Sequence, residues 1–193
     1  MQFIDTHTHI YDPDFAKDIN EVVSRAKEAG AKALVLPNVN NETIMPMLAL
    51  CKTYPSLCFP AIGLHPEDVK DDYLAQLHAM EEHLNASPTQ YVAIGEIGID
   101  LYWDATNKTA QIDAFRLQIE WAIAHQLPII IHTRNAHRKV VDTLLPFRNQ
   151  LVGGIFHCFG GTAEEAAELL TFPNFYLGIG GVLTFKKSTL PAV

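Results

Sequence analysis

The segment Phe3-Ile4-Asp5-Thr6-His7-Thr8-His9 begins the chain with a short apolar strand that runs directly into two histidines. Side chains two residues apart on an extended strand project from the same face. We therefore expect His7 and His9 to direct two imidazoles at one point. Imidazole is a good ligand for divalent transition metals. The pair alone does not prove a metal site. Two polar residues that merely contact water at the end of a strand would show the same pattern.

The same pattern, an apolar strand that ends in a polar side chain, recurs further along the chain. The later instances are Gly63-Leu64-His65-Pro66, Val92–Glu96, Pro128–His132 and Gly153–His157. A lone histidine after a strand is more often a core or loop residue than a ligand. Four imidazoles and one carboxylate at successive strand ends, however, can together hold two metal ions about 3.5–4 Å apart. The expected metal ligands are His7, His9, Glu96, His132 and His157.

Three residues are candidates for a catalytic role. Glu96 is expected after a buried apolar strand, where a carboxylate is costly unless it is paired or binds a metal, and its alternative is an ordinary loop acid. His65 is placed to contact the substrate or a bound water. Arg134 carries a planar fork suited to phosphate oxygens, although a surface salt bridge is an equally good explanation. Asp100, in Gly98-Ile99-Asp100, is expected to orient a ligand.

Short apolar runs alternate with helical patterns over all 193 residues, which predicts one α/β domain, residues 1–193. The expected strands are residues 3–5, 33–36, 59–64, 92–95, 129–131, 154–156 and 175–177. The expected helices are residues 15–29, 42–53, 71–84, 109–125, 136–145 and 162–170, with a further helix start at residues 186–190.

The position of the polar residues distinguishes between a doubly wound sheet and a barrel. Polar side chains at the ends of five different strands favour a (β/α) TIM-type barrel, which places its chemistry there. No glycine-rich phosphate loop follows the first strand, as a doubly wound nucleotide-binding sheet would require. A complete barrel has eight strands and about 250 residues. We therefore expect seven of the eight strands and a C-terminal truncation.

Composition restricts the functional classes further. The net charge of −8 argues against a broad basic platform for duplex DNA, but not against a nuclease, since bound cations reverse the field locally. The three cysteines, Cys51, Cys58 and Cys158, have no Cys-x-x-Cys spacing and are expected to be buried structural thiols, with Cys158 set apart because it follows His157. No signal peptide and no apolar run of about 18 residues is visible, so we expect a cytoplasmic protein without a membrane partner.

Other chemistries receive little support. No Gly-x-Ser-x-Gly segment is present, so a serine hydrolase is not indicated, whereas metal-assisted hydrolysis needs no covalent nucleophile. Four further histidines fall within helical stretches and are expected to be surface or packing residues. They are His78, His83, His125 and His137.

The five ordered motifs, over essentially the whole chain, resemble the signatures of the TatD-type metal-dependent deoxyribonucleases. The resemblance implies a TIM-like barrel of the amidohydrolase superfamily that hydrolyses phosphodiester bonds of DNA, often from a strand end. It implies that His7 and His9 hold one metal and that Glu96 bridges both. It implies further that His132 and His157 hold the second metal, and that the ions are magnesium, manganese or zinc.

The sequence departs from the family pattern in three places. Asn135 stands where an acid is common after His-Thr-Arg, and Gly160-Gly161 replaces a serine-glycine pair. The family's last motif, which carries an aspartate after the eighth strand, does not occur before Val193. From this absence we expect the chain alone to be poorly stable and nearly inactive.

Two other functions are compatible with these motifs. One is an amidohydrolase-like or polymerase-histidinol-phosphatase-like enzyme that acts on a small molecule. The other is an inactive fragment that binds metal without turnover. The expected partner is therefore DNA or a small phosphodiester, and no protein partner is implied.

Overall fold

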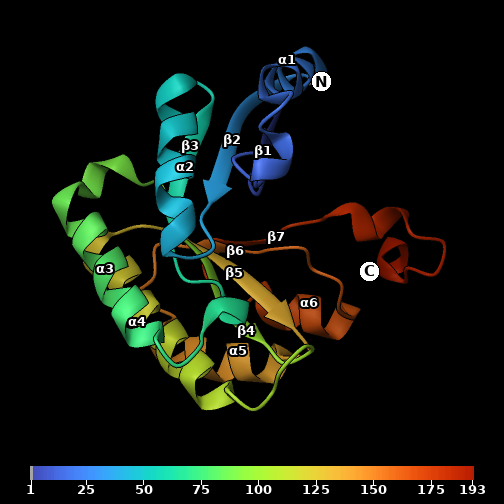
Figure 1. The fold of residues 1–193 in the computed structure, drawn as a ribbon. Helices are drawn as coiled ribbons and strands as arrows, with labels where there is room; N and C mark the ends of the chain where they lie inside the picture. The colour runs from blue at the N-terminus through green and yellow to red at the C-terminus, as the bar shows by residue number, and fades with distance from the viewer. Residues whose placement is uncertain (1) are drawn as a thin grey trace.

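Seven parallel strands in one sheet form the centre of the computed structural model, which describes residues 2–193 (Figure 1). Neighbouring strands pair in the order of the sequence. The strands are β1 (Phe3–Asp5), β2 (Ala31–Pro37), β3 (Cys58–Ile62), β4 (Ala93–Asp100), β5 (Ile129–Arg134), β6 (Gly154–Phe156) and β7 (Phe175–Leu177). This arrangement confirms the predicted α/β fold class.

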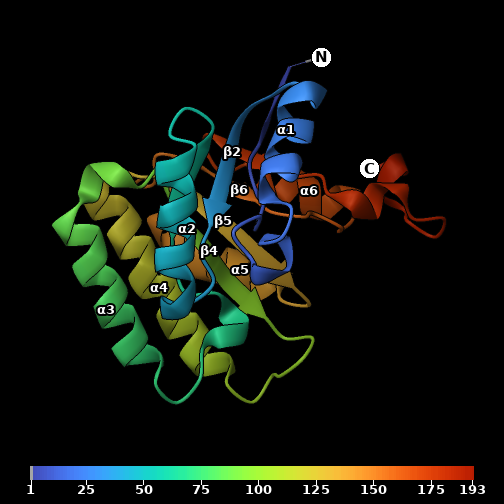
Figure 2. The same ribbon diagram turned by 45° about the horizontal axis from the view of Figure 1, so that its top comes forward.

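Helices connect the successive strands and cover the outside of the sheet. They are α1 (Ile19–Ala29), α2 (Asn41–Thr53), α3 (Tyr73–Ala86), α4 (Lys108–His125), α5 (His137–Leu144) and α6 (Ala163–Leu169). Helices α3 and α4 lie side by side outside the sheet (Figure 2). Helix α6 begins with the capping box that Thr162 and Glu165 predict, in which each side chain accepts the other's backbone N–H.

The sheet curls strongly along its strand order. In a flat sheet β1 and β6 would lie five positions, or roughly 24 Å, apart at the usual strand spacing of about 4.8 Å. Instead the ring of His7, just after β1, stacks on the ring of His157, just after β6, with centroids 3.4 Å apart. A TIM-type curvature explains this contact, because it turns the carboxyl ends of distant strands toward one axis.

The hydrophobic core lies between the sheet and its helices. All eight residues of β4 are buried, as expected for a parallel strand covered on both faces. From α4, Phe115 and Ile119 pack into this core with no exposed surface. No helix of residues 2–193 is both long and apolar enough to span a bilayer.

Two sequence expectations need correction. Strand β4 continues to Asp100 and β5 to Arg134, so Glu96 and His132 lie within strands and not after them. The reason is the pairing of β4 with β5, which resumes beyond Glu96 after a shift of register between Ile94 and Ile97. Such a bulge re-aims the side chain that it carries.

The helix start expected at residues 186–190 is wrong. That segment forms turns, flanked by 3₁₀ turns at Gly181–Thr184 and Leu190–Ala192. The hydroxyl of Ser188 accepts the N–H of Leu190, and Pro191 has no N–H to donate to an α-helical hydrogen bond.

Candidate metal centre

The two histidines of the opening motif converge as the sequence predicts. Their Nε2 atoms lie 2.9 Å apart. The hydroxyl of Tyr11 donates to the carbonyl of Pro37, and the same oxygen lies 2.8 Å from Nδ1 of His9. Tyr11 therefore accepts the Nδ1–H of His9 and leaves the Nε2 lone pair directed at the site. Burial raises the pKa of Tyr11, which keeps the hydroxyl protonated.

Glu96 lies between imidazoles on both sides. Its Oε2 is 3.0 Å from Nε2 of His7, and its Oε1 is 3.0 Å from Nδ1 of His132. His9 and His65 each place Nε2 3.7 Å from Oε2. Burial alone would raise the pKa of Glu96, but the hydrogen bonds of these imidazoles hold it well below its usual range. The side chain is thus an ionised carboxylate with one oxygen toward each group of histidines.

His132 is oriented by Asp100, as the sequence suggested. Nε2 of His132 lies 2.8 Å from Oδ2 of the buried Asp100, so this nitrogen carries a proton and Nδ1 faces Glu96. Burial lowers the pKa of His132, but its hydrogen bonds to Glu96 and Asp100 outweigh burial and raise it. A proton and a metal ion would therefore compete for Nδ1.

His157 and His65 are two imidazoles of the site whose pKa is lowered. Burial, followed by the charge of His7, lowers the pKa of His157 to about 4. Burial also lowers the pKa of His65 to about 4. Both rings are consequently neutral near pH 7, which is the form that a metal ligand requires.

The contacts of His65 distinguish it from the other histidines. Its Nδ1 accepts the backbone N–H of Glu67 at 3.2 Å, so Nε2 carries the proton. This N–H points toward Nδ1 of His132, 3.2 Å away. The geometry suits a hydrogen-bond donor, in agreement with the contact role expected for His65.

The donor set suits divalent cations. The ligand atoms of His7, Glu96 and His157 all lie within 4.8 Å of one another, and those of His65, Glu67 and His132 form a second such group. Among residues 2–193, the buried Nδ1 of His7 has no hydrogen-bond partner, which is consistent with a ring whose position is set by ligation and not by a second contact. Glu67 was not predicted from the sequence, because an acid that follows His65-Pro66 in a loop does not by itself indicate a metal ligand.

Buried amides fix the backbone around the centre, and the sequence did not identify them. Asn38, after β2, accepts the N–H of Gly63 at 2.6 Å. Gln118 of α4 accepts the N–H of Leu64 at 2.6 Å, and Gln111 of α4 accepts the N–H of Asp100 at 2.8 Å. Tyr11 could have been found, since it continues the two-residue spacing of His7 and His9. Nothing in the sequence singles out the three amides.

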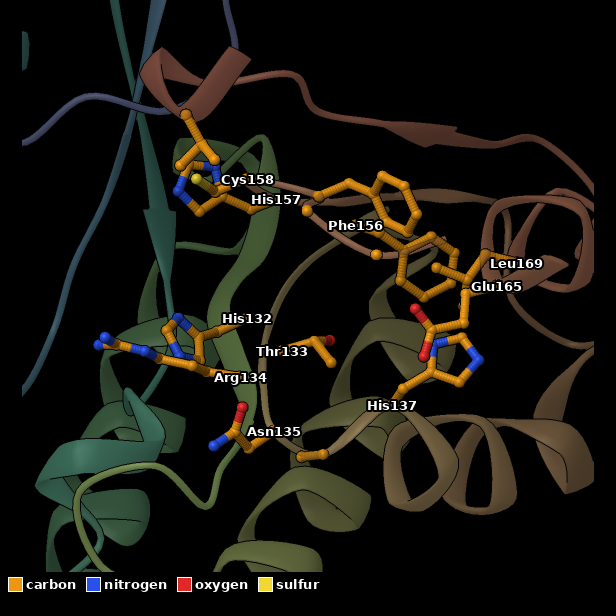
Figure 3. Close-up of a pocket in the computed structure, with 15 residues that line it drawn as sticks. His132, Thr133, Arg134, Asn135, His137, Phe156, His157, Cys158, Glu165 and Leu169 are labelled. Atoms are coloured by element: carbon orange, nitrogen blue, oxygen red, sulfur yellow. The ribbon is translucent and has the colours of Figure 1, made fainter. Parts of the chain in front are cut away.

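Arg134 projects from β5 on the same side as His132, while Thr133 points the opposite way (Figure 3). The guanidinium carbon of Arg134 lies 3.8 Å from the centroid of the Tyr102 ring. The structure thus places Arg134 against an aromatic ring, where the sequence had allowed a surface salt bridge. His132, Arg134 and His157 also line a cavity of about 760 Å³ that extends toward His137 (Figure 3).

The remaining histidines and cysteines lie outside the metal centre, although His137 and Cys158 line the adjoining cavity. His137 and Arg138 of α5 both pair with Glu168 of α6, and His78 pairs with Glu82 on the surface of α3. The cysteines are free, as expected, but Cys158 is exposed and not buried. It has a positive φ of 47° in the turn that follows His157.

Comparisons with known proteins identify relatives of the chain. The family described as TatD related DNase matches residues 4–192. The "uncharacterized metal-dependent hydrolase YabD" of Bacillus subtilis is 38% identical over 190 residues, which are 97% of this chain and 72% of that protein. The "3'-5' ssDNA/RNA exonuclease TatD" of Pectobacterium carotovorum is 32% identical over 92% of this chain and 67% of that protein.

Solved structures agree with the sequence comparisons. The crystal structure of YjjV, a TatD homologue from Escherichia coli, superposes with a TM-score of 0.90 at 30% identity over 98% of this chain and 73% of that one. A TatD-family hydrolase of Entamoeba histolytica superposes with a TM-score of 0.81 at 22% identity, which supports the fold alone.

Proposed function

Since the chain belongs to the TatD-related DNase family of metal-dependent hydrolases, we propose that it hydrolyses phosphodiester bonds of single-stranded DNA with two divalent metal ions. The observation that carries this proposal is the position of Glu96. One carboxylate oxygen faces Nε2 of His7 and the other faces Nδ1 of His132, each at 3.0 Å. A single buried carboxylate between two groups of imidazoles suits two ions, one on each side of it.

In this proposal His7 and His9 would hold one ion, His132 and His157 would hold the second, and Glu96 would contact both. His157 lies against His7 and Glu96, so it would reach the second ion from the side of the first. A pair of ions held in this way would polarise a phosphoryl oxygen and increase the acidity of water. The imidazole-rich set favours zinc-like ions, whereas magnesium and manganese prefer oxygen ligands. Relatives named 3'-5' ssDNA/RNA exonuclease support single strands as substrates and the 3' end as the site of attack.

The chain's own groups assist the reaction in distinct ways. Asp100 and Tyr11 fix the tautomers of His132 and His9, so that each presents a lone pair to the site. The Nε2–H of His65 is available to donate a hydrogen bond to a phosphoryl oxygen that enters the site. Arg134 would receive a neighbouring phosphate, because it lies two residues beyond His132 on the same side of β5.

The test is metal-dependent cleavage of a labelled single-stranded oligonucleotide. With manganese, magnesium and zinc added separately, at least one ion should restore cleavage to protein that a chelator has inactivated. Glu96→Gln should reduce cleavage at least 100-fold, in keeping with the loss of a group that organises both ions, as about 10²-fold effects are usual for such losses. The matched control is His78→Asn, because His78 is exposed and, among the described residues, pairs with Glu82 alone.

A second candidate function is hydrolysis of a small phosphate ester. The observation in its favour is the cavity of about 760 Å³ beside His132 and His157, which could enclose a small molecule. Bis(p-nitrophenyl) phosphate and a phosphomonoester distinguish the two functions. If the protein cleaves a small ester in a Glu96-dependent way and leaves oligonucleotides intact with every metal, the nuclease proposal is wrong.

A further inference from the structure

Two large aromatic side chains are exposed in the loop that follows β4. Tyr102 is 51% exposed and Trp103 is 66% exposed, and their rings meet edge to face with centroids 4.7 Å apart. Adjacent exposed aromatic rings lose the free energy that burial would provide, and such groups commonly mark a binding surface.

Arg134 lies against the same two rings. Its guanidinium carbon is 3.8 Å from the Tyr102 centroid and 5.2 Å from the Trp103 centroid. The planar cation thus forms a close cation–π contact with the Tyr102 ring and a longer one with the Trp103 ring. We call Tyr102, Trp103 and Arg134 the aromatic platform.

The aromatic platform is fixed to the metal centre by one buried carboxylate. Asp100 accepts the backbone N–H of Tyr102 at Oδ1, 2.8 Å away, and contacts Nε2 of His132 at Oδ2, also 2.8 Å away. The backbone N–H of Leu101 donates to the carbonyl of Arg134 at 2.9 Å, which ties the loop to β5. The platform therefore cannot move far without disturbing the orientation of His132.

The surroundings leave space beside the indole ring. A second cavity, of about 240 Å³, lies between Trp103 and the start of α4. Lys70 and Asn107 contribute to its lining together with the carboxylates of Glu67, Asp100 and Asp104. A flat group that stacks on Trp103 could place its polar edge in this cavity.

We propose that the aromatic platform is a base-stacking subsite, which holds an unpaired nucleobase of the substrate strand while Arg134 contacts an adjacent phosphate. This inference rests on the proposed nuclease function. Aromatic side chains bind single strands by stacking on the faces of bases, and they tolerate most sequences because every base has such a face. In a duplex the faces are already stacked on neighbouring pairs, so the platform selects an unpaired strand end.

Intrinsic fluorescence offers a direct test, because the chain has two tryptophans and the other one, Trp121, is buried. The metal-loaded protein is titrated with a phosphorothioate-linked single-stranded oligonucleotide, which resists cleavage. Stacking should quench the fluorescence of Trp103. An abasic oligonucleotide of the same length retains the backbone charge but has no bases, so it should leave the fluorescence unchanged and bind more weakly.

Variants separate stacking from a structural role of the loop. Trp103→Ala should weaken binding of the base-containing oligonucleotide roughly 5- to 150-fold, the range for loss of one stacked base, and Trp103→Phe should retain most of the affinity. Binding of the abasic strand should be the same in all three proteins. The matched control is Tyr176→Ala, because Tyr176 is an equally exposed aromatic residue on β7, at the opposite edge of the sheet from β1.

The outcomes distinguish the two proposals. If the wild-type protein cleaves oligonucleotides but binds abasic and base-containing strands equally, or if Trp103→Ala binds both as tightly as the wild type does, the stacking subsite is refuted and the nuclease function stands. If the wild-type protein cleaves no oligonucleotide with any metal, the proposed function fails first.

Discussion

At the scale of single residues, the chemistry of the centre depends on which nitrogen of each imidazole carries the proton and which one faces the site with a lone pair. His9 is fixed by the hydroxyl of Tyr11, His132 by Asp100 and His65 by the backbone N–H of Glu67. These second contacts leave an unprotonated lone pair on Nε2 of His9 and on Nδ1 of His132. They leave His65 with a proton on Nε2. The chemistry therefore depends on residues that need not touch an ion themselves.

Asp100→Asn is the sharpest test of this arrangement. An amide in place of the carboxylate weakens the hold on Nε2 of His132 and can invert its tautomer, so metal affinity should fall about 10- to 100-fold. Calorimetric titration of the metal-free protein measures this change. Asp104→Asn is the matched control, because Asp104 is exposed and, within residues 2–193, its side chain forms hydrogen bonds with Thr106 alone. Equal affinities of wild type and Asp100→Asn would show that Asp100 does not orient a ligand.

The pKa values of His65 and His157 predict a pH dependence of stability in metal-free protein. Both are lowered to about 4 in the folded state, against an ordinary value of 6.5. Below pH 6.5 the unfolded chain binds more protons than the folded one, so the free energy of unfolding should fall as the pH drops from about 6.5 to about 4.

The thermal midpoint, followed by circular dichroism in a chelator, should fall over that window. The raised pKa of His132 acts in the opposite direction, but above pH 6.5 and not within the window. His157→Asn removes one of the two titrating groups and should make the decline shallower. A midpoint that stays level between pH 6.5 and 4 would contradict the assignment of these two rings as neutral and buried.

At the scale of elements, the pairing of β4 with β5 places both carboxylates of the site. Strand β4 carries Glu96 at a shift of register and Asp100 opposite Arg134. The close approach of the strands requires glycine at Gly98, where φ is +146° and an added Cβ would lie 2.0 Å from the carbonyl oxygen of His132. A side chain at this position would displace the backbone of His132.

Gly98→Ala should therefore lower the free energy of unfolding by at least about 3 kcal/mol, since backbone strain and steric overlap act together. Urea denaturation gives this value. Gly181→Ala is the control, because nothing lies within 4 Å of a Cβ built at Gly181. A change below about 1 kcal/mol in Gly98→Ala would mean that the strands can separate at little cost.

Most helices and strands were predictable from the sequence, and the one long error, at the end of β4, has a cause in its residue composition. The apolar runs gave all seven strands and the amphipathic stretches gave α1 to α6 within a few residues, because both periodicities are properties of the chain itself. The continuation of β4 through Gly95-Glu96-Ile97-Gly98 was missed, since its two glycines and its acid are atypical of a strand. Only the pairing with β5 holds that segment extended.

At the scale of the whole molecule, the net charge of −8 and the single aromatic platform predict local contact with nucleic acid. For single strands the logarithm of affinity falls with the logarithm of salt by about 0.7 for each neutralised phosphate. With contacts confined to the metal centre and Arg134, the slope should be no steeper than about −2. Binding of a cleavage-resistant oligonucleotide at several salt concentrations measures it, and Arg134→Ala should reduce the slope while metal content stays unchanged.

A slope of −4 or steeper would imply an extended basic surface and would contradict local contact. Lys108→Ala provides the comparison, because Lys108 is exposed at the start of α4. If removing Lys108 lowers the slope as much as removing Arg134 does, phosphates must be bound well beyond the centre.

The sequence alone determined the α/β alternation, the identity of the histidines and acids, and their order along the strands. These features follow from local periodicity and from side-chain chemistry, which are written in consecutive residues. The tertiary structure decided which of them meet. The stacking of His7 on His157 depends on the curl of the whole sheet, and the contact of Arg134 with Tyr102 depends on the register of β4 against β5. Curvature and register are set by the packing of many distant residues together, so no local pattern specifies them.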